Sequence, residues 1–144
     1  MYTRALEITE KALGPEHPYV GNRLNNLAGV YCDLDRYPEA ELMYTRALEI
    51  TERAFGPEHP NVAICLNNLT LCFYNQHKYL KSRPYYEKAI KVTEATKGQN
   101  SLEVASLLER YASVLDKLKR NREATTKRNR AKGIRSKIEK GNDK

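Results

Sequence analysis

We predict from the sequence an all-α protein in which about seven helices form a solenoid of antiparallel pairs. The prediction rests on an internal repeat, on the helical spacing of apolar residues and on regularly placed helix breakers. The segment MYTRALEITE fills residues 1–10 and returns unchanged at residues 43–52. Residues 43–84 match residues 1–42 at about half of their positions, and a weaker third copy starts at Tyr85. A structural unit of 42 residues is therefore repeated along the chain.

Each repeat contains two amphipathic helices joined by a turn. Apolar residues within 38–55 follow the spacing of one buried helical face, and a second such stripe lies within 19–35, before the turn DLDRYP. The stripe residues are Val20, Leu24, Leu27, Ala28, Tyr31, Ala40, Met43, Tyr44, Ala47, Leu48, Thr51, Ala54 and Phe55. A single hairpin cannot bury its stripe alone, so neighbouring hairpins are expected to stack.

Glycine and proline mark the helix ends. Gly56 is expected to end one helix with a positive φ, Pro57 prevents its continuation, and Pro60 suits the first turn of the next helix. The predicted helices are 1–13, 19–35 paired with 38–55, 61–76 paired with 79–96, and 101–118 paired with 121–139. The predicted organisation is a single array over 1–140, with 1–18 as the second helix of an incomplete repeat, 19–60 and 61–100 as repeats, 101–140 as a degenerate repeat with a polar capping helix, and 141–144 as a disordered tail.

The composition excludes several protein classes. Charged residues make up 30% and hydrophobic residues 40%, which suits a soluble helical protein rather than a disordered one. No apolar run approaches the ~20 residues of a membrane helix, and the N-terminus does not resemble a signal peptide. Cys32, Cys65 and Cys72 are odd in number and lack a CxxC spacing, which argues against a disulfide framework or a zinc site. We therefore expect a cytoplasmic protein in a reducing compartment.

The net charge of +7 is unevenly distributed. Residues 117–144 hold twelve Lys and Arg against three acids, a net charge of +9, so residues 1–116 carry −2. Such a basic segment could bind nucleic acid or an anionic surface. It contains no aromatic residue that could stack on bases, and a solvated capping helix is the interpretation that we favour.

Two stretches resemble a known family. LNNLAGVY…YPEAELMYTRAL and LNNLTLCF…YLKSRPYYEKAI resemble tetratricopeptide repeats, and the 42-residue period with its GPEHP loops is similar to the kinesin light chain subclass. The resemblance implies a right-handed superhelix that acts as a non-enzymatic scaffold, binds a protein or peptide and needs no cofactor. The motif positions hold Leu24, Leu27, Ala28, Tyr31, Ala40, Tyr44 and Ala47, then Leu66, Leu69, Thr70, Phe73, Ser82, Tyr86 and Ala89, then Leu108, Tyr111, Ala112, Leu115, Ala124, Arg128 and Ala131.

The sequence departs from the repeat pattern at both ends. Arg128 replaces the buried aromatic residue of the third repeat, and the helix around it is polar, so the array is expected to end there. Met1 aligns with Met43, so the chain is expected to be the C-terminal part of a longer array that opens within a repeat. The first helix then lacks its own partner, which favours self-association through Ala5, Leu6 and Leu13.

The repeated GPEHP loop places Glu16 beside His17 and Glu58 beside His59, a combination that would suit metal binding or acid–base catalysis. The third loop, KGQNS, has lost both residues although its flanking helices persist. We therefore interpret these residues, and His77 in the turn NQHKY, as loop residues. The sequence also contains no Gly-rich phosphate loop and no nucleophile elbow, so we predict no catalytic, cofactor-binding or metal site.

Paired asparagines recur at one position of the repeat, as Asn25–Asn26 and Asn67–Asn68, on the helix that lines the concave face. Their amides both donate and accept hydrogen bonds, so they could bind the backbone of an extended peptide. The alternative is that one asparagine of each pair caps or bridges helices within the stack. The resemblance implies that Asn26 and Asn68 contact peptide, with Arg110 at the matching place in the third repeat.

A lysine one turn earlier is needed by family members that clamp a terminal carboxylate, and this chain has Asn22 and Ser106 there. An internal segment of a partner is therefore the expected ligand. The predicted floor of the groove comprises Asn22, Asn25, Asn26, Gly29, Asp33, Asn67, Asn68, Leu71, Asn75, Arg110, Ser113 and Lys117.

Overall fold

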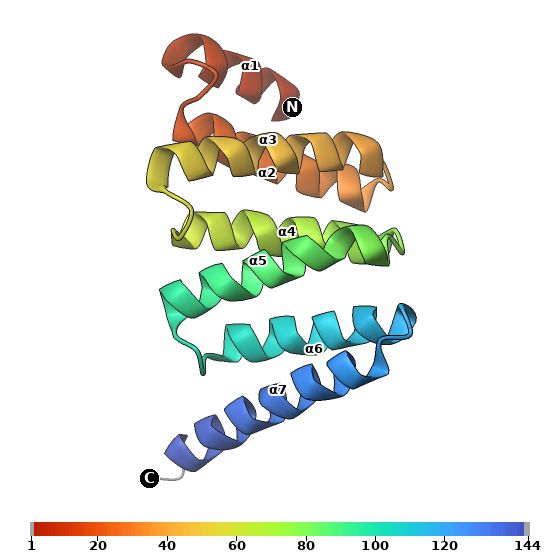
Figure 1. Cartoon of the computed structure of the whole chain (residues 1–144). Helices are drawn as coiled ribbons and strands as arrows, with labels where there is room; N and C mark the ends of the chain where they lie inside the picture. The colour runs from red at the N-terminus through yellow and green to blue at the C-terminus, as the bar shows by residue number, and fades with distance from the viewer. Residues whose placement is uncertain (1, 143–144) are drawn as a thin grey trace. The chain divides into compact units, whose positions relative to one another are not determined.

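The computed structural model describes residues 2–142, and these form seven helices (Figure 1). The helices are α1 (Tyr2–Leu13), α2 (Pro18–Asp33), α3 (Tyr37–Phe55), α4 (Pro60–Asn75), α5 (Tyr79–Lys97), α6 (Leu102–Lys117) and α7 (Asn121–Asn142). The predicted all-α class is confirmed. One boundary is wrong, because α7 continues through Gly141 and Asn142, which were predicted to lie in a disordered tail. Residues 143 and 144 of that tail, and Met1, lie outside the described residues.

The chain divides into two compact units, residues 1–72 and residues 73–144. The boundary lies inside α4, whereas the sequence predicted a single array with repeat borders after residues 18, 60 and 100. The first unit contains α1, α2, α3 and most of α4. The second contains the end of α4 together with α5, α6 and α7. Among the described residues, every helix is too short or too polar to traverse a bilayer.

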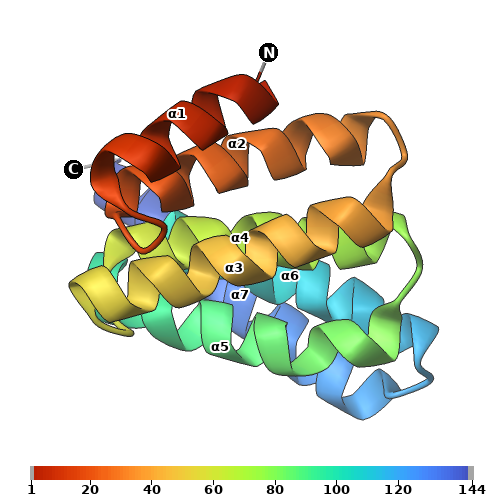
Figure 2. The same cartoon turned by 90° about the horizontal axis from the view of Figure 1, so that it is seen from above.

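The antiparallel pair of α2 and α3 forms the core of the first unit (Figures 1 and 2). Its buried side chains are those of Val20, Leu24, Leu27, Ala28, Ala40, Tyr44, Ala47, Leu48 and Ile50. The two helices approach closely at Gly21, where an added Cβ would lie 3.3 Å from Thr51 Oγ1. The predicted stripe ends early, because Phe55 is 44% exposed and its ring stacks on His59 with 4.4 Å between centroids.

Helix α1 lies beside α2 (Figure 2) and is tied to α3 by an ion pair between Glu10 and Arg46 at 2.8 Å. Ile8 is 59% exposed and Leu13 is 45% exposed, while Leu6 is half-buried. The side chain of Ala5, which the sequence also assigned to an uncovered face, lies outside the described residues. Part of the apolar surface of α1 is therefore open to solvent.

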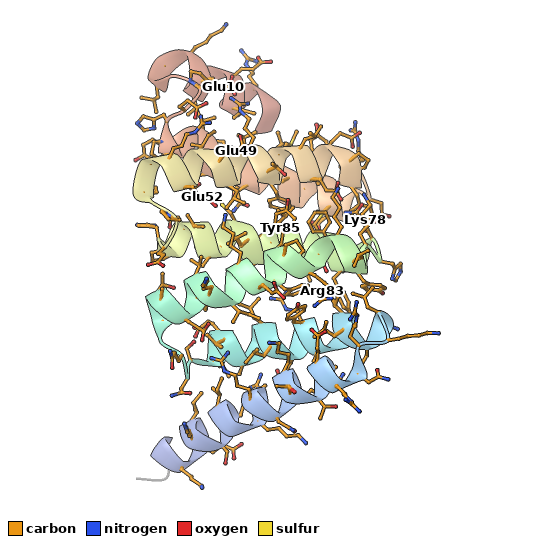
Figure 3. All side chains as sticks on the ribbon, in the orientation of Figure 1. Glu10, Glu49, Glu52, Lys78, Arg83 and Tyr85 are labelled. Carbon is orange, nitrogen blue, oxygen red and sulfur yellow. The ribbon has the colours of Figure 1, made fainter. Side chains whose placement is uncertain are left out.

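The second unit is built on the antiparallel pair of α6 and α7, with α5 packed against α6. Tyr86 of α5 and Tyr111 of α6 are fully buried, and their rings stack with 5.4 Å between centroids. Arg83, labelled in Figure 3, donates to Glu123 of α7 at 3.0 Å and to the Tyr111 hydroxyl at 3.4 Å. That hydroxyl donates to Glu87 at 2.8 Å. A single polar network thus joins α5, α6 and α7.

The histidines of the GPEHP loops bind the starts of two helices. The Nδ1 atom of His17 accepts the backbone N–H of Tyr19 at 3.2 Å, and that of His59 accepts the N–H of Asn61 at 3.1 Å. Ser101 takes this place at α6, where its hydroxyl accepts the N–H of Val104 at 3.3 Å. The third loop could therefore lose its histidine because a serine satisfies the same orphan backbone donors.

Turns at equivalent repeat positions adopt the left-handed backbone conformation without glycine. Asp35, His77 and Lys119 have φ values of 58°, 60° and 62°. This conformation is unfavourable for a residue with a Cβ, although Asp and His adopt it more readily than Lys. Gly56, by contrast, ends α3 with a φ of 90°, as the sequence predicted.

Candidate peptide-binding surface

A polar stripe runs along α2 in the first unit. Asn22, Asn26, Gly29 and Asp33 are spaced by four, three and four residues, so they share one side of the helix. Asn22, Asn26 and Asp33 are exposed. Gly29 is half-buried, and a Cβ placed on it would lie 3.6 Å from the Tyr44 hydroxyl. The α2 side of the predicted groove is therefore open to solvent and rich in amides.

The matching side of α4 is more apolar. Asn67 is exposed and Leu71 is 44% exposed, as expected for two residues of a groove. Ile64, which the sequence analysis missed, is 53% exposed on the same side of the helix. The repeat itself carried the missing signal, since Ile64 stands 42 residues after Asn22 and occupies the same repeat position.

A hydrogen bond between asparagines joins the two helices. Nδ2 of Asn68 donates to Oδ1 of Asn25 at 3.3 Å, and both side chains are half-buried. The first asparagine of one pair thus bridges to the second asparagine of the next pair, the alternative role that the sequence had left open. Asn26 and Asn68, which the resemblance treated alike, differ here because only Asn26 is exposed.

The Asn25–Asn68 hydrogen bond brings one side of α2 next to one side of α4 in the first unit, and we call these residues the asparagine face. Its members are Asn22, Asn25, Asn26, Gly29, Asp33, Ile64, Asn67, Asn68 and Leu71. The thiols of Cys32 and Cys72, with 3.0 Å between their sulfur atoms, join the same two helices further along. Two cross-contacts therefore join α2 and α4.

The remaining predicted groove residues belong to the second unit. Asn75 is exposed at the last position of α4. Arg110 and Ser113 are half-buried on α6, and Lys117 is exposed at its end. Their spacing of three and four residues places these three on one side of α6. The Ser113 hydroxyl donates to the carbonyl of Glu109 at 3.4 Å, within its own helix.

A cleft of about 530 Å³ in the second unit was not predicted. It lies between α5, α6 and α7 and contains none of the predicted groove residues. Glu94 in its wall pairs with Arg130 at 2.7 Å, and Glu87 accepts the Tyr111 hydroxyl at 2.8 Å. Several of its polar groups are therefore bonded to one another across the cleft.

Three arginines of the basic C-terminal helix form ion pairs with acids of the same unit. Arg128 pairs with Asp116, Arg130 pairs with Glu94 at 2.7 Å, and Arg135 binds both oxygens of Glu109 at 2.7 and 2.8 Å. The hydrogen bonds from Arg135 lower the pKa of Glu109. The buried side chains of α7 are Ala124, Ala131 and Ile134. These contacts tie α7 to α5 and α6.

The ionisable loop residues make contacts that explain their presence without chemistry. Glu16 pairs with Arg53 at 3.0 Å, while His17 and His59 receive helix N–H groups as described above. The His77 ring bonds the Tyr79 hydroxyl at 2.6 Å. Within the part of the chain that the structure describes, no three His, Cys, Asp or Glu side chains gather as a metal site would require.

Comparison with known proteins identifies the family. A sequence profile of the tetratricopeptide repeat matches residues 1–53 and residues 22–95. The chain belongs to the tetratricopeptide repeat family. This family is typically a non-enzymatic scaffold. No curated protein was found to match the sequence.

Several solved structures share the fold of the chain. BtubC (BKLC) from P. vanneervenii is similar with a TM-score of 0.88 at 26% identity, over 96% of this chain and 55% of that one. A putative kinesin light chain of Podosopora anserina with nearly identical TPR-like repeats has a TM-score of 0.79 at 17% identity, over 95% of this chain and 65% of that one. A point variant of the latter gives 0.81 at 16% identity, over 96% of this chain and 66% of that one. The chain thus spans under two thirds of each of these proteins.

Proposed function

We propose that the chain is a protein-interaction module that binds an extended, internal peptide segment of a partner protein along the asparagine face. The observation that supports this most strongly is the side-by-side placement of exposed amides on α2 and exposed apolar side chains on α4, held by the Asn25–Asn68 bond. An extended peptide presents an unpaired N–H and C=O at each residue and side chains on alternate sides. The amides of α2 can pair with the peptide backbone, and the apolar side chains of α4 can contact the peptide side chains.

The packing of the first unit favours such binding, because helices hold the face before a ligand arrives. A preformed surface avoids part of the ordering cost that association otherwise imposes. The face also offers little to a terminal carboxylate. The lysine position one turn before the asparagines holds Asn22 in α2 and Ile64 in α4, so neither repeat supplies a cation there.

A peptide-library screen on the purified full chain identifies a ligand, and substitutions then test the face. Asn26→Ala should weaken binding by about 5- to 150-fold, which corresponds to about 1–3 kcal/mol for backbone groups left unpaired. Asn129→Ala is the matched control, because Asn129 is an exposed asparagine of α7 that does not belong to the face. The double variant Asn26→Ala, Asn68→Ala should lose more. Full affinity in that double variant, with folding intact by circular dichroism, would refute the proposal.

A further inference from the structure

Two thiols from different repeats face each other inside the first unit. Cys32 lies near the end of α2 and Cys72 lies on α4, and their sulfur atoms are 3.0 Å apart. Both are in the thiol form and not joined by a disulfide bond. The sulfurs of a disulfide are about 2.05 Å apart, so the two side chains need to close by about 1 Å to bond. The sequence analysis missed this pair because the two residues stand 40 positions apart and at different repeat positions.

The two thiols differ in access, which assigns them different parts in a reaction. Cys32 is half-buried and therefore the more accessible residue of the two, whereas Cys72 is 1% exposed. The Tyr44 hydroxyl also hydrogen-bonds Cys32. The pKa of the Cys32 thiol is raised, mainly by burial and further by the charges of Asp33 and Glu41, and its hydrogen bonds to Cys72 and Tyr44 offset part of this rise. Cys32 is thus the thiol that a reagent meets first.

The third cysteine offers an internal comparison. Cys65 is 5% exposed, and the Thr51 hydroxyl lies 3.9 Å from its sulfur. Burial raises the pKa of the Cys65 thiol as well. Cys65 is therefore less accessible than Cys32.

We propose that Cys32 and Cys72 form a dithiol site that reacts with low-molecular-weight disulfides of neutral or positive charge and closes to an internal disulfide. The charge preference follows from the carboxylates of Asp33 and Glu41, whose negative charge acts on Cys32. An anionic disulfide is repelled by the same two groups. This proposal is independent of peptide binding.

The reaction is two successive thiol–disulfide exchanges. In the first, the Cys32 thiolate attacks one sulfur of the reagent, a mixed disulfide forms, the bond of the reagent breaks, and the departing thiolate takes up the proton that Cys32 lost. In the second, deprotonated Cys72 attacks Sγ of Cys32 and releases the other half of the reagent, which takes up the proton of Cys72. The protein is oxidised from two thiols to one disulfide, and the reagent is reduced from one disulfide to two thiols.

The test treats the folded full chain with three disulfide reagents, alkylates the remaining thiols and maps them by mass spectrometry. The reagents are cystamine, hydroxyethyl disulfide and oxidised glutathione, which are cationic, neutral and anionic. We expect a Cys32–Cys72 crosslink with Cys65 alkylated, formed several-fold faster with cystamine than with oxidised glutathione. The oxidised chain should also melt about 5–10 °C higher, and reductant should reverse the shift.

Variants separate the two steps. Cys72→Ser should stop at a stable mixed disulfide on Cys32, Cys32→Ser should leave Cys72 unmodified in the folded chain, and Cys65→Ser should change nothing. If a variant fails to fold, pulse alkylation of the unaltered chain still ranks the thiols, and Cys32 should react first. An unreactive Cys32, a mixed disulfide that persists in the unaltered chain, a crosslink to Cys65, or equal rates with all three reagents would overturn the proposal.

Discussion

Leu69 and Leu71 lie two positions apart on α4 and face opposite environments, since Leu69 is 0% exposed and Leu71 is 44% exposed. Replacing each by alanine removes the same atoms from two different settings. Leu69→Ala leaves a cavity and should lower the free energy of unfolding by about 3–5 kcal/mol. Leu71→Ala removes atoms that water already reaches and should lower it by less than about 1 kcal/mol.

Chemical denaturation followed by circular dichroism measures both losses, and a melting curve should show Leu69→Ala about 10 °C below the unaltered chain. The pair also separates stability from binding, because Leu71 belongs to the asparagine face. Leu71→Ala should lower the affinity for an identified peptide ligand, whereas Leu69→Ala should leave the affinity of the folded fraction unchanged. Equal losses of stability in the two variants, or a midpoint that Leu69→Ala does not move, would show that the orientation of α4 is wrong.

Four further predictions follow from single residues or surfaces. Lys119→Gly should raise the free energy of unfolding by about 0.5–1 kcal/mol, because Lys119 has a φ of 62° that glycine adopts without a Cβ clash, and a lower denaturation midpoint would contradict this. Arg135 lowers the pKa of Glu109, so their ion pair stabilises the fold above the unfolded-state pKa of Glu109 and stops doing so as the pH falls through the lower folded-state pKa. Glu109→Gln should therefore reduce the stability lost on acidification by less than about 1 kcal/mol, since both side chains remain accessible. An unchanged dependence of stability on acidic pH would count against this. Mobility-shift assays near physiological salt should show no binding of DNA or RNA, because three of the four arginines of α7 pair with acids of their own unit. A band shifted by the protein would instead support nucleic-acid binding. Light scattering on concentrated protein tests self-association through α1, which Ile8→Lys should reverse because Ile8 is 59% exposed; a monomer at every concentration would exclude it.

The helices could be predicted because their signals are local. Glycine and proline at fixed intervals set the ends, and apolar residues at helical spacing set the buried faces. Gly56, for example, ends α3 where the sequence placed the end, with the expected positive φ. The extension of α7 through Gly141 was missed, because Gly141 suggests a helix end although the helix continues through it.

Contacts between repeats could not be predicted in the same way. The asparagine that turns toward the neighbouring helix depends on how α2 and α4 are rotated against each other, and the sequence does not encode that rotation locally. Asn25 and Asn68 are therefore partners although they hold different places in their pairs. Cys32 and Cys72 align with Tyr74 and Val30 in the repeat, so comparing repeats cannot reveal their contact.

The hydrogen bond from the Asn68 side-chain amide to the Asn25 side-chain amide also bears on the alignment of α2 and α4. If α4 slid along α2 by one helical turn, about 5.4 Å, both half-buried amides would lose their partner, whereas a leucine would exchange one apolar neighbour for another. Apolar packing alone tolerates such a slip, and a polar pair penalises it. Apolar residues around the pair can thus vary without changing which turns of α2 and α4 lie opposite each other. The Asn25–Asn68 hydrogen bond, rather than the hydrophobic core, therefore sets the spacing of the asparagine face.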